Sequence, residues 1–245
     1  MGLLREAARV SVGRVLITGA AKRIGRVIAV ELSRRGFEVA IHYGTSRAEA
    51  EQVSRDCGNA PIFQADLAHV EQIRRLFGEV EQRFGLLHCL VNNAARFTRI
   101  DALDISEADW DFIHQVNLKA TFFCCQEGAR QMRRLGAGRV VNISSLGGIR
   151  PWAEHVHYCA SKAGVIMLTR ALAKALAPEI TVNSVAPGVI SFDDVDARVQ
   201  AMIDATPMRR AGKPEEIADA VHFFLTAPDF VTGQTLAVDG GLSER

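Results

Sequence analysis

The stretch Thr18-Gly19-Ala20-Ala21-Lys22-Arg23-Ile24-Gly25 decides the fold, because it joins an apolar run to a helical pattern through a glycine turn. The run at residues 14–18 predicts a buried strand, and apolar residues at helical spacing predict a helix over residues 24–35. Glycine lets a backbone approach a phosphate, and the first turn of a helix offers unpaired N–H groups. The turn is therefore expected to bind a phosphate-bearing ligand; a simple tight turn is the alternative.

Strands and helices alternate along the rest of the chain. Further strands are expected at residues 38–43, 61–65, 88–92, 139–144, 181–186 and 235–238. Further helices are expected at residues 46–57, 70–84, 106–135, 156–176 and 214–226. Nearly continuous Val, Ile and Leu in the strands are typical of a parallel sheet. The sequence predicts an α/β fold: a single doubly wound parallel-sheet (Rossmann) domain over residues 1–245, with seven strands and helices on both faces. Ligands of such folds bind at the carboxyl ends of the strands.

Composition excludes several classes of protein. The chain has 245 residues, 29 Lys and Arg against 28 Asp and Glu, and 48% hydrophobic residues, so it is neither disordered nor dependent on a dense basic face for nucleic-acid binding. No apolar run approaches the roughly 20 residues of a membrane helix. Residues 1–13 are expected to form a surface lead-in rather than a signal peptide. Five cysteines, none in a C-x-x-C pair, favour reduced thiols and a cytoplasmic location.

The glycine turn resembles that of the short-chain dehydrogenase/reductase family, which holds a dinucleotide there. Arg23 stands where the usual family pattern has glycine, and this version of the turn is similar to the pteridine reductase branch. In that branch the arginine contributes to cofactor phosphate and pterin binding. An arginine fork also suits an anion on physical grounds.

The residues after the second strand favour NADP over NAD. An NAD site usually places Asp or Glu there, whereas this chain has His42-Tyr43-Gly44-Thr45-Ser46-Arg47. Ser46, with Glu49 three residues later, predicts a capping box at a helix N-terminus, which can bind anions. In the pteridine reductases the matching residues hold the 2′-phosphate. A basic residue common in that branch is Thr45 here, and Arg47 is a possible replacement.

Asp66 follows the third strand and has two interpretations. By resemblance to the family, its carboxylate accepts a hydrogen bond from the adenine amino group. The alternative is an N-cap for the next helix, and the two are compatible. Ser106 with Asp109 predicts a second capping box.

Tyr158 and Lys162 are four residues apart on a helical segment, so they share one face. A nearby ammonium stabilises a phenolate and lowers the tyrosine pKa. Ser145 ends the fifth strand at the expected ligand edge, where it can hydrogen-bond a substrate carbonyl. By resemblance, Asn117 completes the catalytic set by anchoring a water in a proton relay.

The resemblance covers residues 15–241 and extends to the loops after the fourth and sixth strands. The residues it assigns to cofactor binding are Gly19, Lys22, Arg23, Ile24, Gly25, His42, Tyr43, Ser46, Asp66, Leu67, Asn93, Ala94, Ala95, Tyr158, Lys162, Pro187, Gly188 and Val189. It implies an NADP(H)-dependent oxidoreductase in which the cofactor gives hydride to a carbonyl or C=N group and Tyr158 donates the proton.

Three residues bear on the identity of the substrate. Arg23 and Phe97 match the pteridine reductases, in which the phenylalanine stacks against a pterin. Ser145, by contrast, stands where the best-known members of that branch have aspartate. Together with Tyr158 they form the predicted substrate-binding set. Phe97 as the pocket wall for any apolar substrate is the alternative. Residues 189–212 are expected to form a substrate lid. Phe192, Asp193, Asp194, Met202 and Met208 are its candidate lining residues.

Three functions follow from these patterns. The first is a pteridine-reductase-like enzyme acting on a dihydropterin or dihydrofolate. The second is an NADPH-dependent reductase of another carbonyl, such as a 3-oxoacyl thioester, a sugar or a small ketone. The third, a non-catalytic dinucleotide-binding protein, is disfavoured by the complete catalytic set. The resemblance also implies a homotetramer joined through helices 106–135 and 156–176. No histidine spacing indicates a metal, and His155 and His157 either shape the pocket or lie on a surface loop.

Overall fold

The sheet has seven parallel strands in the order β3-β2-β1-β4-β5-β6-β7. The computed structural model describes residues 13–192 and 197–244, so most of the predicted lead-in lies outside the described residues. The strands are β1 (Arg14–Ile17), β2 (Glu38–Tyr43), β3 (Ile62–Gln64), β4 (Cys89–Asn92), β5 (Gly138–Ile143), β6 (Ile180–Pro187) and β7 (Thr235–Val238). The predicted fold class is confirmed.

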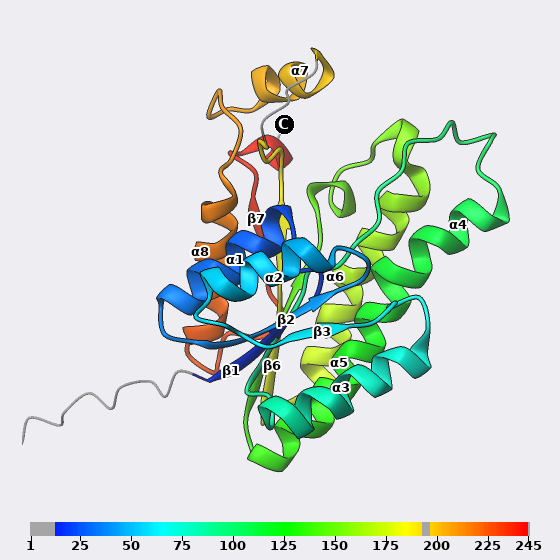
Figure 1. Cartoon of the computed structure of the whole chain (residues 1–245). Helices are drawn as coiled ribbons and strands as arrows, with labels where there is room; N and C mark the ends of the chain where they lie inside the picture. The colour runs from blue at the N-terminus through cyan, green and yellow to red at the C-terminus, as the bar shows by residue number, and fades with distance from the viewer. Residues whose placement is uncertain (1–12, 193–196, 245) are drawn as a thin grey trace, which may run out of the picture.

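Two layers of helices cover the sheet (Figure 1). The helices are α1 (Arg23–Arg34), α2 (Arg47–Asp56), α3 (Val70–Phe84), α4 (Glu107–His114), α5 (Ala120–Leu135), α6 (Val156–Leu176), α7 (Ala197–Ala205) and α8 (Pro214–Thr226). Side chains alternate across β1: Val15 and Ile17 pack in a core with α1, α2 and α8, whereas Leu16 packs with α3, α5 and α6 on the other face. Both faces are therefore buried, which explains why the strands are apolar throughout.

The helix expected over residues 106–135 is not continuous. Gln115–Lys119 form a π-helical turn, η1, between α4 and α5. The side chain of Asn117 explains the break, because it bonds the Arg96 backbone in both directions, at 2.7 Å from the amide N and 2.9 Å from the carbonyl O. Such turns insert a residue into a helix and are frequent at functional sites.

Two of the three predicted N-terminal caps differ from expectation. Ser106 and Asp109 form the capping box predicted for them. Ser46 does occupy the N-cap of α2, but its side chain makes no capping bond, and the Glu49 side chain, expected to complete the box, pairs with Lys22 at 2.7 Å. Asp66 is not an N-cap: His69 takes that position in α3, and Asp66 Oδ1 accepts from the Ala68 amide at 3.0 Å.

The segment between β6 and α8 contains α7, a helix that the sequence pattern did not predict. It stands apart from the two helix layers, at the top of the view in Figure 1. Ile190 and Gly212 form a parallel bridge that holds the two ends of this segment together, with the Gly212 amide 2.8 Å from the Val189 carbonyl. Within the described residues, no helix has the length and apolar character needed to span a membrane.

Candidate active site

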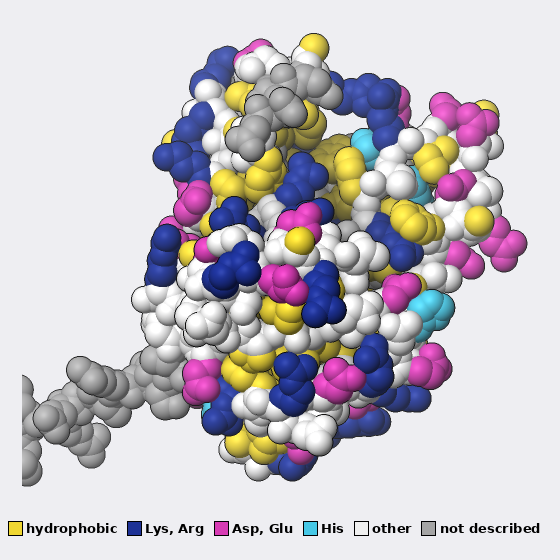
Figure 2. Space-filling model, viewed as in Figure 1, with side chains coloured by type: hydrophobic (Ala, Val, Ile, Leu, Met, Phe, Trp, Pro, Cys, Tyr) yellow, Lys and Arg dark blue, Asp and Glu magenta, His cyan; other side chains and the backbone are white. Residues whose placement is uncertain are grey.

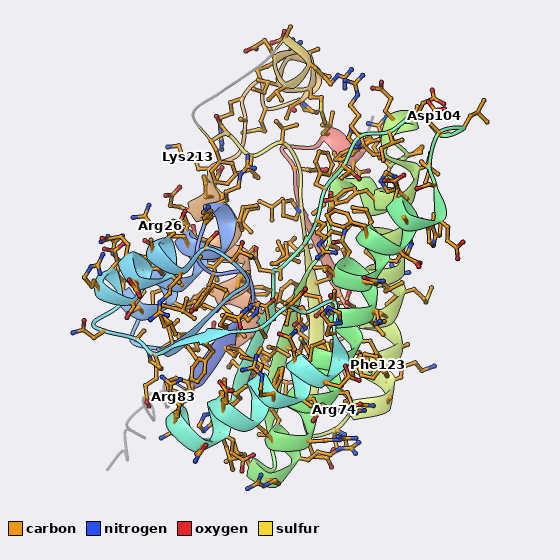
Figure 3. All side chains as sticks on the ribbon, turned by 45° about the vertical axis from the view of Figure 1, so that its right-hand side comes forward. Arg26, Arg74, Arg83, Asp104, Phe123 and Lys213 are labelled. Carbon is orange, nitrogen blue, oxygen red and sulfur yellow. The ribbon has the colours of Figure 1, made fainter. Side chains whose placement is uncertain are left out.

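A cavity of about 730 Å³ lies where the strand order reverses, at the carboxyl ends of β1 and β4. Figure 2 shows this face hollowed below the α7 segment, with hydrophobic side chains inside the hollow. In Figure 3, Lys213 at the start of α8 and Asp104 between β4 and α4 lie on opposite sides of it. The predicted residues that line the cavity are Gly19, Lys22, Arg23, Ile24, Gly25, His42, Tyr43, Ser46, Asp66, Leu67, Asn93, Ala94, Ala95, Phe97, Ser145, Tyr158, Lys162, Pro187, Gly188 and Phe192.

The glycine turn is tightly clamped to the end of β4. Gly19 has φ +62°, and a Cβ on Gly25 would stand 2.2 Å from the Gly19 carbonyl O. The Thr18 hydroxyl accepts from the amides of Asn93 and Ala94, at 3.0 and 3.1 Å. Because no larger residue fits, the turn holds the N-terminus of α1 open toward the cavity.

Arg23 begins α1 with φ +52°, in the left-handed region that ordinary residues avoid. Its guanidinium lies 4.9 Å from the centre of the Phe192 ring, across the cavity. A strained, exposed arginine at a phosphate-binding turn fits a functional role better than a structural one.

His42 differs from the expectation of a basic group facing the phosphate. Its Nδ1 accepts from the Gly19 amide at 3.1 Å, and its Nε2 donates to the Ala65 carbonyl at 3.1 Å. Burial lowers the pKa of His42 to about 4, so the ring is neutral. It borders the cavity as an internal crosslink between the ends of β1, β2 and β3.

Near the end of β2, the structure separates the basic residues that the sequence grouped together. Lys22 lines the cavity, whereas Arg47 pairs with Glu51 at 2.9 Å and does not line it. Arg47 therefore does not replace the missing basic residue at Thr45. Arg96 lines the cavity too, 3.9 Å from Asp66.

Ser145, Tyr158 and Lys162 line the same cavity as the glycine turn. The expected fall in the pKa of Tyr158 beside Lys162 is wrong for this structure: desolvation raises that pKa to about 12, and a hydrogen bond with Ser145 only partly opposes the change. Burial lowers the pKa of Lys162 to about 8, and its Nζ donates to the Ile143 carbonyl at 2.9 Å. The ammonium lies 5.9 Å from the centre of the Tyr158 ring. A buried phenol beside a lysine and a serine is an arrangement suited to proton transfer.

Two of the predicted catalytic and cofactor-binding residues do not line the cavity. Asn117 lies behind the site, because its amide is occupied by the Arg96 backbone and by Ser161 Oγ at 3.1 Å. Val189 instead forms the base of the residue 190–212 segment.

The sequence relationships agree with this geometry. A sequence model described as Enoyl-(Acyl carrier protein) reductase matches residues 19–243. A short-chain type dehydrogenase/reductase of Picea abies is 38% identical over 94% of this chain and 92% of its own length. The chain belongs to the short-chain dehydrogenase/reductase family. It is therefore an oxidoreductase of that family.

Other members of the short-chain dehydrogenase/reductase family are similarly close. The 3-oxoacyl-[acyl-carrier-protein] reductase FabG of Staphylococcus aureus is 38% identical, over 93% of this chain and 96% of its own. A gluconate 5-dehydrogenase of Burkholderia cenocepacia, solved in complex with NADP and tartrate, superposes with a TM-score of 0.88 at 32% identity, covering 95% of each chain. These relatives do not show the pteridine reductase branch that the glycine turn suggested.

Aromatic side chains form the wall of the cavity around Tyr158. Phe97 is 58% exposed and meets the Tyr158 ring edge to face at 4.7 Å. Trp152 stacks parallel to the same ring at 6.1 Å, and Ile190 and Phe192 also line the cavity. Sequence analysis missed Trp152 and Ile190. The position of Trp152, shortly before Tyr158 in a loop leading to the ligand edge, was the available signal. Met202 and Met208 do not line the cavity, and Asp193 and Asp194 lie outside the described residues.

Proposed function

We propose that the protein is an NADP(H)-dependent reductase of carbonyl compounds. The observation that carries the proposal is one cavity lined both by the glycine turn and by Ser145, Tyr158 and Lys162. A turn that fits a phosphate and a group of side chains that fits proton transfer therefore face the same cavity. The similarity to a 3-oxoacyl reductase and to an NADP-bound gluconate dehydrogenase supports it.

The residues of the turn fit a dinucleotide. A Cβ at Gly25 would fill the space beside the Gly19 carbonyl, so the pair keeps the backbone open for a pyrophosphate. Tyr43, Ser46 and Lys22 would hold the 2′-phosphate, since no acidic side chain lines the cavity just after β2. Lys22 supplies the positive charge there, in part offset by Glu49.

The chain's residues position a carbonyl and supply its proton. The Ser145 hydroxyl donates a hydrogen bond to the substrate oxygen, and the Tyr158 phenol donates the proton. Because burial keeps Tyr158 protonated, the resting site is set for reduction. The Lys162 ammonium, 5.9 Å from the centre of the Tyr158 ring, stabilises the resulting phenolate. The nicotinamide, when bound, supplies the hydride.

A dihydropterin is a second candidate substrate. Arg23 keeps a strained backbone at the glycine turn, and its guanidinium faces Phe192 across the cavity while Phe97 offers an exposed ring. A flat heteroaromatic ring would be recognised by this combination. Ser145 instead fits a ketone, so Arg23 and Ser145 favour different substrates.

Steady-state oxidation of NADPH and of NADH, with acetoacetyl thioester and with 7,8-dihydrobiopterin, tests both candidates. Turnover with NADPH and the thioester supports the main proposal, and turnover with the pterin alone establishes the second. Tyr158→Phe should bind NADPH normally and lose more than about 100-fold in turnover, as expected for a lost proton donor. Full turnover by Tyr158→Phe would refute the mechanism.

We also propose a cytoplasmic homotetramer. Large apolar side chains are exposed on α4, α5 and α6, among them Trp110, Phe112, Phe122 and Met167. Exposed apolar surface of this kind marks contact surfaces. Light scattering of the purified protein should give four times the chain mass, and Phe122→Asp with Met167→Asp should reduce it.

A further inference from the structure

A pair of histidines joins two loops beside the cavity. Residues 97–100 follow β4, and residues 152–157 lead into Tyr158. The Ile100 amide donates to the Glu154 carbonyl at 3.0 Å, and Arg99 forms an ion pair with Glu154. Both loops are therefore fixed to each other near the reacting tyrosine.

His155 contacts the loop of residues 97–100 in two ways, by ring stacking and by a hydrogen bond. Its ring stacks on Phe97 with 4.5 Å between centroids and 20° between planes. Its Nδ1 donates to the Thr98 carbonyl at 2.9 Å. The imidazole supports the side of Phe97 away from the open cavity, because His155 does not line that cavity.

His157 contacts Thr98 from the interior of the protein. It is fully buried, with Nε2 2.6 Å from the Thr98 hydroxyl. Burial lowers the pKa of His157, so the ring stays neutral at physiological pH. Its Nδ1 has no partner among the described atoms, which leaves the Thr98 contact as its polar anchor.

These contacts decide where one wall of the cavity stands. Phe97 meets Tyr158 edge to face at 4.7 Å, while Trp152 lies parallel to the Tyr158 ring at 6.1 Å. A shift of Thr98 would move the Phe97 ring relative to the phenol that donates the proton. Arg198 of α7 also pairs with Glu154 at 3.1 Å, so the residue 190–212 segment meets the joined loops as well.

We infer that His155 and His157 are positioning residues that set substrate specificity, by holding Thr98 so that Phe97 forms a fixed wall against Tyr158. The inference rests on the proposed reductase function, in that the wall faces the carbonyl substrate. The two histidines act through Phe97 and touch neither substrate nor cofactor.

Thr98→Val and His155→Phe test the two contacts separately, with Thr98→Ser as the matched control that keeps the hydroxyl. The KM and kcat are measured with NADPH and whichever of acetoacetyl thioester and 7,8-dihydrobiopterin the wild type reduces. Each variant should raise KM about tenfold, as expected for a lost buried hydrogen bond, with kcat changed less than about threefold. Thr98→Ser should behave as wild type, and the affinity for NADPH should not change. Wild-type KM in both Thr98→Val and His155→Phe would overturn the inference.

A second readout does not depend on turnover. In a Trp110→Phe background, Trp152 is the remaining tryptophan, and its ring lies 5.8 Å from that of His155. Acrylamide quenching of Trp152 should increase about twofold in Thr98→Val and His155→Phe but not in Thr98→Ser, because loosened loops expose the ring. Unchanged quenching in both variants would overturn the positioning role. If the wild type reduces neither probe, neither proposed substrate is correct, while quenching still decides whether the histidines fix this wall.

Discussion

Replacing Lys162 by methionine should make the cofactor-free protein more stable while abolishing its activity. Lys162 is 2% exposed, and burial lowers its pKa to about 8 from an ordinary 10.5. That difference corresponds to a cost of about 3 kcal/mol for holding the charge at pH 7. Methionine removes the charge and loses the hydrogen bond to Ile143, worth about 1 kcal/mol. The net gain at pH 7 is therefore about 2 kcal/mol.

The stability advantage of Lys162→Met should depend on pH, in a direction set by the lowered pKa of Lys162. Because the folded pKa lies below the unfolded one, the cost is fully present below pH 8 and is relieved as the pH rises toward 10.5. Urea unfolding of both proteins at equal concentration should show the advantage of Lys162→Met falling from about 2 kcal/mol at pH 7 to near zero at pH 9.5.

Lys174→Met is the matched control, because Lys174 is an exposed lysine on the same helix. It should change the unfolding free energy by less than about 0.5 kcal/mol at both pH values. The reasoning is refuted if Lys162→Met is less stable than the wild type at pH 7, or if its advantage does not change with pH.

Three further predictions concern the glycine turn and the residues beside it. Lys22→Ala should raise the KM for NADPH about tenfold and leave the KM for NADH unchanged. Glu49→Gln should lower the KM for NADPH, because it removes the negative charge beside Lys22. Equal effects on the two cofactors would count against a 2′-phosphate contact. Arg23→Gly and Arg23→Ala should weaken substrate or NADPH binding to the same extent. Calorimetry should find Arg23→Gly about 1 kcal/mol more stable than Arg23→Ala, because glycine tolerates the positive φ at this position. Equal stability of the two variants would contradict the backbone strain. Gly25→Ala should abolish NADPH binding in titrations, because its Cβ has no room in the turn. The control Gly78→Ala, in open space on α3, should raise the free energy of unfolding by about 1 kcal/mol and leave binding intact. NADPH binding by Gly25→Ala would contradict the clamped turn.

Periodicity predicted the seven strands because both faces of the sheet are buried, and a buried strand is apolar throughout. It did not predict the π-helical turn, since that turn depends on bonds between Asn117 and the backbone of Arg96, 21 residues earlier. The helix α7 was also missed. None of its residues is buried, so no apolar stripe marks it in the sequence.

The motifs after the strands predicted most of the cavity lining, because parallel strands end at one edge. What they did not predict are pairings between distant side chains. The Glu49 side chain pairs with Lys22 rather than with the Ser46 backbone. Both ring nitrogens of His42 bond the backbone, one to the Gly19 amide and the other to the Ala65 carbonyl. Residue type at a motif position identifies a place in the fold, whereas the bonding partner decides whether the side chain faces the ligand.

The Ile190–Gly212 bridge has a consequence for how new specificities could arise. The bridge holds the two ends of the segment together beside β6 and α8, and two further contacts tie the segment to the fold: the Met208 amide donates to the Gly240 carbonyl at 3.2 Å, and Arg198 pairs with Glu154. An exchanged segment that keeps these contacts should leave β6 and α8 in place. The residues proposed for proton transfer and dinucleotide binding lie outside this segment, whereas Ile190 and Phe192 of the segment line the cavity. Grafting the corresponding segment of a relative between Ile190 and Gly212 is therefore the most economical way to redirect this enzyme to another substrate.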